Sequence, residues 1–326
     1  MPRITYREAI NEALREELLR DENVFLMGED IGKHGGAFAV TKGLWDEFGS
    51  KRIKDTPISE NTIVGCGVGA AITGMRPVIE IMFMDFVTLA LDQIVNHAAK
   101  IRYLSGGQQK VPLVIRTQQG GGGEKGTAAQ HSQCLEAWFV HVPGLKVVLP
   151  STPCDAKGLL KASIRDDNPV IYIEHKNCYP LQGEVPQNDY IVPLGRADIK
   201  RKGKDVTVIA NGLLLHSTLK VAEELKREGV EVEVIDPLTF SPLDKKTITD
   251  SVKKTGRAVI VHEACKTGGI GGEIGMIILE EAFDYLDAPI QRVGALDAPI
   301  SFSLPEEMRI LPDEKRIKVA IRKVLE

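Results

Sequence analysis

The stretch that decides the fold is PVIEIMFMDFVTLALDQIVNHAAK, from Pro77 to Lys100. Its first part, through Phe83, is a short apolar run of the kind that forms a buried parallel strand. Apolar side chains at helical spacing follow, and they predict a helix over Phe86–Leu104. A strand followed by a helix that covers it is the repeating unit of α/β folds.

The same alternation continues on both sides of this stretch. Strands are also predicted at VFLMGED, VPLVIRT, LKVVLPS and NPVIYIEH, and helices at Thr5–Arg20, at the Gly/Ala run after Glu60 and at Pro153–Asp166. A segment with neither periodicity follows, and the pattern then restarts with DVTVIANG and ends in EKRIKVAIRKVLE. We therefore predict a doubly wound parallel-sheet α/β domain over residues 1–180, a linker over 181–195 and a smaller α/β domain over 196–326.

Composition and charge argue against several classes of protein. The 326 residues carry a formal net charge of −4 with the two signs interspersed, whereas a nucleic-acid or anionic-membrane surface needs a basic field. No apolar run approaches the ~20 residues of a membrane span, and the N-terminus reads as a charged amphipathic helix rather than a signal peptide. The five cysteines are scattered without CxxC spacing. They predict free, mostly buried thiols, no structural zinc and a cytoplasmic location.

Three glycine-rich stretches resemble phosphate-binding loops, and none matches one fully. TQQGGGGEKGT (Thr117–Thr127) lacks the order Gly-Lys-Ser/Thr of a P-loop, and GCGVGAAITG (Gly65–Gly74) has no strand leading directly into it. TGGIGGEIG (Thr267–Gly275) follows a strand and opens a helix, but Ile274 stands where a dinucleotide fingerprint needs its third glycine. An NAD-dependent oxidoreductase is therefore an alternative function, but the third glycine that would distinguish it is absent. Close helix–sheet packing is the simpler explanation of these glycines.

Glu60 and His131 are the strongest candidates for chemistry. Glu60 stands before a run from Thr62 to Gly74 that contains no charge. Burying a carboxylate costs several kcal/mol unless it is paired, hydrogen-bonded or protonated, so Glu60 either lies on a solvated turn or serves a chemical purpose. His131 and His34 lie in polar or glycine-rich sequence just past predicted strands, where sheets of this kind bind ligands. Packing better explains three other histidines, His97, His141 and His262.

Several long motifs resemble a known family. They include YREAINEALREEL, RIKDTPISE, MFMDFVTLALDQIVNHAAK, AAQHSQCLEAWFVHVPGLKVVLPSTPCDAKGLL and VHEACKTGG. They closely resemble the beta subunit of thiamine-diphosphate-dependent 2-oxo acid dehydrogenases, a group within the transketolase superfamily that includes the pyruvate, branched-chain and acetoin enzymes. The resemblance covers essentially the whole chain.

The resemblance implies roles for individual residues. Glu60, in ISE, would hydrogen-bond a ring nitrogen of the aminopyrimidine of thiamine diphosphate and relay the proton that activates the cofactor. An apolar setting favours the protonated form of a carboxyl group, which suits that role. His131, in AAQHSQ, would contact the substrate or the reacting intermediate and donate a hydrogen bond or a proton. Three further residues would line the pyrimidine pocket: Ile58, Met82 and Phe86.

The resemblance also implies a potassium site. Main-chain oxygens and one carboxylate would form it, and oxygen ligands suit a hard cation. The segment IRDDNP is equally a helix end running into a turn, so that alternative stays open. The residues concerned are Leu113, Ser163, Ile164, Asp166 and Asn168.

The absence of one motif implies a partner. Thiamine enzymes hold the diphosphate through a metal bound by a Gly-Asp-Gly sequence, which does not occur in this chain. The resemblance therefore implies an α2β2 heterotetramer in which a separate alpha subunit supplies the diphosphate half of the site and holds magnesium. A lipoyl-bearing acyltransferase would receive the acyl group.

The substrate implied is a pyruvate-type 2-oxo acid, with acetoin and then a branched-chain 2-oxo acid as alternatives. A non-catalytic scaffold subunit is the remaining alternative, and the presence of Glu60 and His131 argues against it. The basic face of the terminal helix (residues 314–326) would either dock the acyltransferase or remain solvated on a helix that packs against its own domain.

Overall fold

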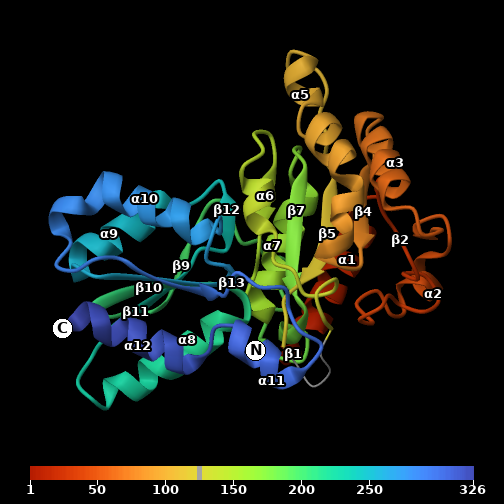
Figure 1. The fold of residues 1–326 in the computed structure, drawn as a ribbon. Coiled ribbons are helices and arrows are strands. Elements are labelled where there is room, and N and C mark those ends of the chain that lie inside the picture. Colours follow the sequence, from red (N-terminus) through yellow and green to blue (C-terminus); the bar gives the residue numbers. More distant parts are fainter. Residues whose placement is uncertain (123–126) are drawn as a thin grey trace. The chain divides into compact units, whose positions relative to one another are not determined.

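The computed structural model describes residues 1–122 and 127–326, which form two compact units (Figure 1). The first unit comprises Met1–Gln119 and Trp138–Leu194. The second comprises Gly120–Ala137 and Gly195–Glu326, so the segment that contains His131 groups with the second unit.

The first unit is built on a parallel sheet with the strand order β6-β7-β5-β4-β2-β3. The chain passes from β2 to its neighbour β3 and then returns across β2 to β4, so the direction of winding reverses at β2. This is the topology of a doubly wound fold, as the sequence predicted. The strands are β2 (Val24–Gly28), β3 (Ile53–Asp55), β4 (Arg76–Ile81), β5 (Val114–Gln119), β6 (Lys146–Val148) and β7 (Val170–His175).

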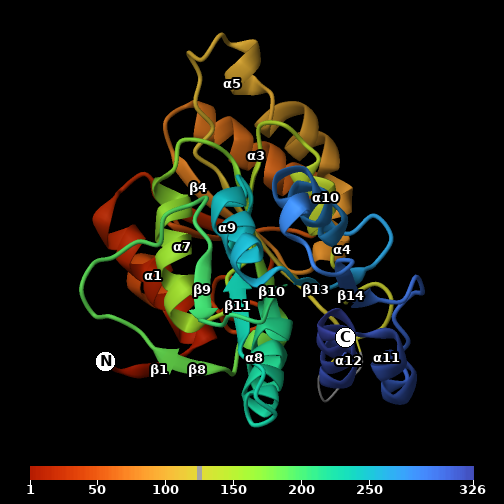
Figure 2. The ribbon, with the colours of Figure 1, turned by 90° about the vertical axis from the view of Figure 1, so that its left-hand side faces the viewer.

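Helix α1 (Tyr6–Arg20) begins where the sequence predicted, because Thr5 and Glu8 form a capping box. It packs beside α7 (Pro153–Arg165), which Thr152 caps (Figure 2). Ion pairs join the two helices: Lys157 is almost fully buried, and its Nζ lies 2.6 Å from Glu16. Other helices of this part of the chain are α2 (Leu44–Phe48), α3 (Glu60–Ile72) and α6 (Glu136–Val140).

The helix predicted over Phe86–Leu104 is helical but not continuous. It consists of α4 (Met84–Val87), a 3₁₀ turn (Thr88–Ala90), a π-helical segment (Gln93–Ala98) and α5 (Ile101–Leu104). Apolar periodicity locates a helical face, but it does not report a change of hydrogen-bond register within that face. Ile94 and Ala98, on the π-helical segment, remain buried.

The predicted linker contains a short strand. Residues Gln182–Glu184 form β8, which pairs antiparallel with β1 (Arg3–Thr5), seen at the lower left of Figure 2. Three residues are too few to display an alternating pattern in the sequence, which explains why neither strand was predicted.

The second unit has a sheet with the strand order β14-β13-β10-β11-β9. Helices α8 and α12 cover one face and α9 and α10 the other (Figure 1). The edge strand β9 (Asp198–Arg201) runs antiparallel to β11 and was not predicted. The other strands of this sheet are β10 (Val206–Ala210), β11 (Val232–Asp236), β13 (Ala258–Cys265) and β14 (Gln291–Ala295), and the short strand β12 (Thr239–Ser241) lies outside it. The helices are α8 (Gly212–Lys226), α9 (Lys245–Thr255), α10 (Ile270–Ala282), α11 (Leu304–Ile310) and α12 (Glu314–Leu325).

Helix α12 packs against its own unit. Its apolar stripe, which includes Ile317 and Ile321, is buried in the core formed by α8 and the sheet. Two cations of its basic face, Lys318 and Arg322, lie 2.9 and 2.8 Å from the Glu228 carboxylate. These pairs favour the interpretation in which the terminal helix packs on its own domain.

The glycines of TGGIGGEIG make room for a histidine. A Cβ on Gly269 would lie 2.7 Å from His262 Cε1, and one on Gly271 would lie 2.7 Å from His262 Nε2. A Cβ on Gly294, from β14, would also crowd the ring, at 3.0 Å. The motif therefore serves close helix–sheet packing around His262, which is the interpretation the sequence favoured over a dinucleotide site.

His262 is fully buried, and its Nδ1 lies 3.1 Å from the Ala264 carbonyl oxygen. Burial lowers the pKa of His262 to about 4, from an ordinary value of about 6.5. A depressed folded-state pKa means that the stability is fully present above the unfolded pKa and declines as pH falls toward the folded pKa. We expect the free energy of unfolding to fall by about 2 kcal/mol between pH 7 and pH 5 through this group alone.

The measurement is urea denaturation of the wild type and of His262→Phe at both pH values. The variant keeps an aromatic ring but cannot titrate, so its pH dependence should be shallower by that amount. Equal slopes for the two proteins would contradict the assignment.

The five cysteines are free, as predicted, but they are not mostly buried. Only Cys178 is buried, whereas Cys66 and Cys265 are exposed. Cys66 lies on the exposed face of α3, and Cys265 is the exposed last residue of β13. In the part of the chain that the structure covers, no helix is long and apolar enough to cross a membrane.

Candidate active site

Two predicted pyrimidine-binding residues, Glu60 and Met82, gather with Glu29 at the carboxyl ends of three adjacent strands. Glu29 follows β2, Glu60 follows β3 by a short turn, and Met82 follows β4. These strands are parallel and lie in the order β4-β2-β3, so their carboxyl ends meet at one edge of the sheet. The winding reverses at β2, and such a switch point is where open α/β sheets bind ligands.

Glu60 is the first residue of α3 and is buried, with 7% of its surface exposed. The preceding residue, Ser59, does not cap the helix, because its hydroxyl donates to Thr62 at 2.9 Å instead. No side chain or backbone group in the described ranges hydrogen-bonds the Glu60 carboxyl group. Buried carboxyl groups are ordinarily hydrogen-bonded, so this one is available to a ligand that enters the site.

Glu29 is a second buried carboxyl group at this edge, and sequence reasoning missed it. It is 8% exposed, and its Oε1 atom is buried without a hydrogen-bond partner among the residues described. Burial raises the pKa of Glu29, and the neighbouring Glu60 carboxylate raises it further. The pair therefore favours retention of a proton at the site. The polar ending GED indicates only the end of a strand, and nothing in its spacing indicates burial.

An apolar wall adjoins Glu60. Ile58, two residues earlier, is 81% exposed, while Met82 and Phe86 are half-buried. The Phe86 ring packs edge-on against Phe83 with centroids 5.8 Å apart, and Phe83 packs in the same way against Phe38. Helix α3 packs against the 3₁₀ turn (Thr88–Ala90) and the π-helical segment (Gln93–Ala98) that follow Phe86. The structure thus brings all four predicted pyrimidine-pocket residues to one region of the first unit.

His131 belongs to the second unit and is half-buried. Two carboxyl groups of that unit hold the segment that leads to it: Glu263 of β13 accepts from the Gly121 N–H at 2.6 Å, and Glu307 of α11 accepts from the Gly122 N–H at 2.7 Å. Local sequence patterns do not indicate these contacts, because the partners are more than a hundred residues apart. The P-loop-like stretch Thr117–Thr127 lies partly outside the described residues. The other histidine candidate, His34, is exposed.

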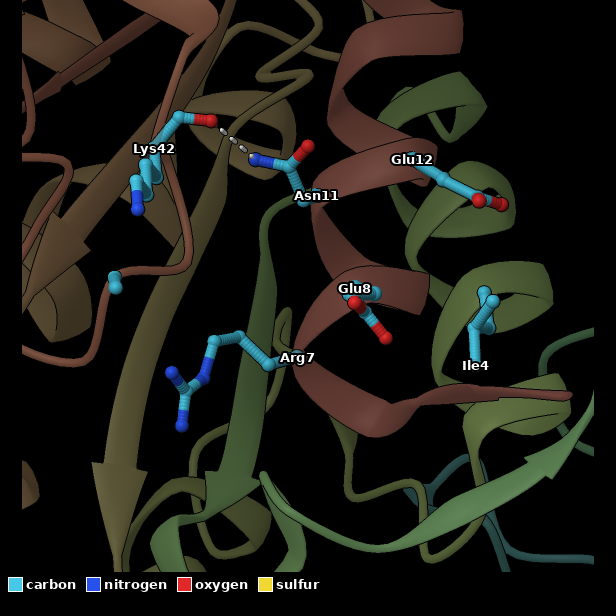
Figure 3. Close-up of a pocket in the computed structure, with 7 residues that line it drawn as sticks. Ile4, Arg7, Glu8, Asn11, Glu12 and Lys42 are labelled. Atoms are coloured by element: carbon cyan, nitrogen blue, oxygen red, sulfur yellow. Dashed lines mark hydrogen bonds between the residues drawn. The ribbon is translucent and has the colours of Figure 1, made fainter.

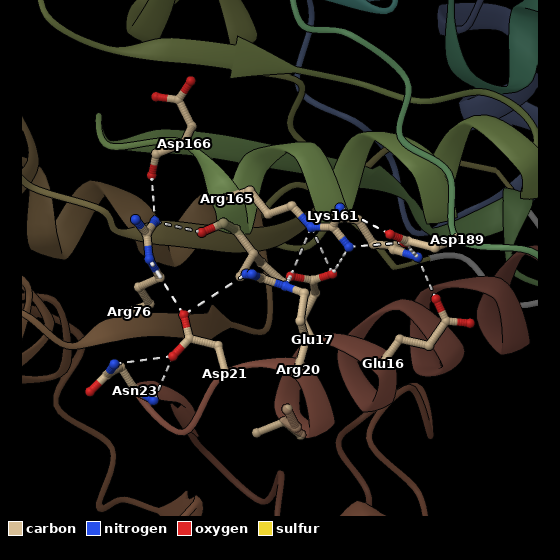
Figure 4. A network of polar contacts seen from close by, with 12 residues as sticks. Glu16, Glu17, Arg20, Asp21, Asn23, Arg76, Lys161, Arg165, Asp166 and Asp189 are labelled. Atoms are coloured by element: carbon tan, nitrogen blue, oxygen red, sulfur yellow. Dashed lines mark hydrogen bonds and ion pairs between the residues drawn. The ribbon is translucent and has the colours of Figure 1, made fainter.

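The predicted potassium ligands also come together, at the start of β5 and the end of α7. The Val170 N–H donates to the Leu113 carbonyl at 2.8 Å, which places residue 113 beside the segment 163–168. One guanidinium nitrogen of Arg76 donates to the carbonyl oxygens of Ile164 and Asp166, at 3.0 and 3.1 Å (Figure 4). The Asp166 carboxylate pairs with Lys146 and accepts from the Asn168 N–H at 2.8 Å.

Two protein cations, Arg76 and Lys146, therefore already contact the oxygens assigned to potassium. Ser163 directs its hydroxyl to the Leu159 carbonyl, within the helix. These contacts match a helix end running into a turn, which was the alternative interpretation of IRDDNP. The potassium site stays a prediction.

Comparison with known proteins places the whole chain in a family. The family model for the transketolase pyrimidine binding domain matches residues 2–182, and that for the transketolase C-terminal domain matches residues 195–317. The chain is 46% identical over 325 residues to the pyruvate dehydrogenase E1 component subunit beta of Rhizobium meliloti, covering 99% of this chain and 70% of the relative. It is equally similar, at 46% identity with 99% of both chains covered, to the 2-oxoisovalerate dehydrogenase subunit beta of Bacillus subtilis.

The chain belongs to the transketolase-like beta subunits of the 2-oxo acid and acetoin dehydrogenases. A third beta subunit, that of acetoin:2,6-dichlorophenolindophenol oxidoreductase from Cupriavidus necator, is 45% identical, with 99% of this chain and 98% of the relative covered. A solved structure titled as a split-gene transketolase in an inactive beta4 tetramer has the same fold, with a TM-score of 0.80 over 99% of this chain and 98% of that chain. At 24% identity it supports the fold alone.

Proposed function

We propose that this beta subunit supplies the pyrimidine-binding half of a thiamine-diphosphate-dependent dehydrogenase that acts on a 2-oxo acid of the pyruvate type. The observation that carries the proposal is Glu60, a buried carboxyl group without a protein partner in the described ranges, at the switch point of the sheet. A scaffold subunit would have no use for such a group, because burying it unpaired costs stability.

The residues at this edge fit the aminopyrimidine of the cofactor. Glu60 would accept or donate a proton at one ring nitrogen, and Glu29 beside it would keep a proton in reserve. The exposed Ile58 and the half-buried Met82 and Phe86 offer the apolar surface on which a flat ring packs. The bound cofactor would supply a carbanion that attacks the substrate carbonyl.

His131 would act on the substrate. An imidazole that can donate a hydrogen bond or a proton suits a site where negative charge develops on a carbonyl oxygen or a carboxylate. The hydrogen bonds from Gly121 to Glu263 and from Gly122 to Glu307 would hold its segment to the second unit.

The proposal includes partners. Because no Gly-Asp-Gly sequence occurs in the chain, an alpha subunit would hold the diphosphate and its magnesium ion in an α2β2 heterotetramer. A lipoyl-bearing acyltransferase would then accept the acyl group. The identities of 45–46% to pyruvate, branched-chain and acetoin subunits are too similar to rank the substrates, so acetoin and a branched-chain 2-oxo acid remain the second and third candidates.

The test is expression of the chain with and without its alpha subunit. We expect the purified beta chain, given thiamine diphosphate and magnesium, to show no decarboxylation of pyruvate above background, and co-expression to restore it. Carbon dioxide release from pyruvate and from 2-oxoisovalerate, and acetaldehyde release from acetoin, would rank the three substrates. Turnover by the beta chain alone would refute the half-site proposal.

A further inference from the structure

We propose that a pocket on the first unit, formed by helix α1 and the loop before α2, binds the phosphate group of a small phosphorylated metabolite. The pocket has a volume of about 460 Å³ and is lined by residues of the N-terminal segment and by Ala39 and Lys42 (Figure 3). None of its residues belongs to the site around Glu60, so the proposal does not rest on the proposed function.

Two cations reach this pocket without a close ion pair, although the Arg7 charge attracts the neighbouring Glu8 carboxylate. Arg7 and Lys42 form no ion pair with any residue in the described ranges. The Arg7 Nε atom is buried and has no hydrogen-bond acceptor there either. Its guanidinium lies 6.0 Å from the centroid of the Tyr179 ring, so one face is covered while its edge N–H groups remain. Guanidinium N–H groups that lack an acceptor are suited to an oxyanion, which they can bind in a bidentate manner.

Of the two acidic residues of the pocket wall, Glu12 is paired with a cation and Glu8 stays ionised. Glu8 accepts from the Thr5 N–H at 2.7 Å and from its hydroxyl at 2.8 Å. These hydrogen bonds lower the pKa of Glu8. Glu12 pairs with Lys157 at 2.8 Å. In Figure 3, Arg7 and Lys42 extend to one side of the pocket, and Glu12 lies on the other.

The two sides of the pocket are tied together. The Asn11 side-chain amide donates to the Val40 carbonyl at 2.6 Å and to the Lys42 carbonyl at 3.2 Å, so the loop is held on α1. The backbone that carries Lys42 is thus held beside α1 before a ligand arrives, which reduces the entropy cost of binding.

The charge and size of the pocket select the ligand class. With Glu12 paired to Lys157, the cations Arg7 and Lys42 and the ionised Glu8 leave one net positive charge on the wall. That charge attracts a phosphomonoester, which carries close to two negative charges at neutral pH, more strongly than a monocarboxylate, which carries one. The pocket is larger than a phosphate group needs, and Ile4 and Ala39 add apolar surface for a short carbon chain.

The experiment is a titration of the full chain, at constant ionic strength, with inorganic phosphate, glycerol 3-phosphate and acetate. We expect saturable binding of one phosphate per chain by calorimetry, and at least tenfold weaker binding of acetate. Arg7→Gln and Lys42→Gln should each weaken phosphate binding roughly tenfold or more, since each removes a charged hydrogen-bonding group.

Lys51→Gln is the matched control, because Lys51 is exposed, lies in the same unit and does not line the pocket. It should bind phosphate as the wild type does. If Arg7→Gln unfolds, Lys42→Gln decides the question, because Lys42 is exposed and we expect its replacement to leave the fold intact. Absence of saturable phosphate binding, unchanged affinity in folded Lys42→Gln, or acetate binding as tightly as phosphate would each overturn the proposal.

Discussion

Glu60→Gln is expected to slow exchange of the thiazolium carbon proton by ~10²–10⁴-fold in the assembled heterotetramer, the range of a general acid–base contribution. Glutamine keeps the volume of the side chain and an oxygen that accepts a hydrogen bond, but it can neither gain nor lose a proton. Glu60 is 7% exposed and has no partner in the described ranges, so no neighbouring group already bonded to it can take over its role. Hydrogen–deuterium exchange of bound cofactor, followed by NMR after acid quench, measures the rate directly.

The control for this variant is Glu22→Gln, an exposed glutamate of the same unit. It removes the same charge and should leave the exchange rate unchanged. Cofactor binding, measured separately, should persist in Glu60→Gln with modest weakening, because the apolar wall remains. Exchange at the wild-type rate in a variant that binds cofactor would show that Glu60 does not relay the proton.

The sequence predicted the parallel sheets and most helices because buried strands and amphipathic helices differ in period. Val170–His175 reads as a continuous apolar strand because it is covered on both faces. The antiparallel strand β9 was missed because its residues, Asp198–Arg201, are half exposed and largely charged at a sheet edge. The break inside Phe86–Leu104 was missed because apolar spacing does not distinguish α-helical from π-helical hydrogen bonds.

Sequence reasoning identified a site residue where its charge differs from the rest of its segment. Glu60 stands out as one charge at the start of an apolar helix. Glu29 does not, since a polar pair after a strand is ordinary, and its burial arises from packing around β2 and β4. The contacts of Glu263 and Glu307 with the glycine segment depend on tertiary structure alone, so local patterns contain no trace of them.

A second large effect is expected at Arg116, which is fully buried in the sheet of the first unit. Its guanidinium donates to Glu80 at 2.5 Å and to both oxygens of Glu174, at 2.7 and 2.9 Å. The Tyr179 hydroxyl also donates to Glu174, at 2.6 Å. Burial alone would lower the pKa of Arg116, but the two glutamates raise it. Burial raises the pKa of Glu174, and the Arg116 charge opposes that rise.

Arg116→Met should therefore destabilise the first unit by about 3–5 kcal/mol at pH 8, because it leaves two buried carboxyl groups without their cation. With Arg116 gone, the folded-state pKa of Glu174 should rise further above its unfolded value. A carboxyl group of this kind contributes stability below the unfolded pKa and loses it as pH rises through the folded pKa, so the variant should recover stability at pH 5. Urea denaturation at both pH values measures this recovery of stability.

The triple variant Arg116→Met/Glu80→Gln/Glu174→Gln, which removes all three charges, should recover much of the loss at pH 8. A cost below about 1 kcal/mol for Arg116→Met, or the same cost at both pH values, would show that the buried charges do not depend on Arg116.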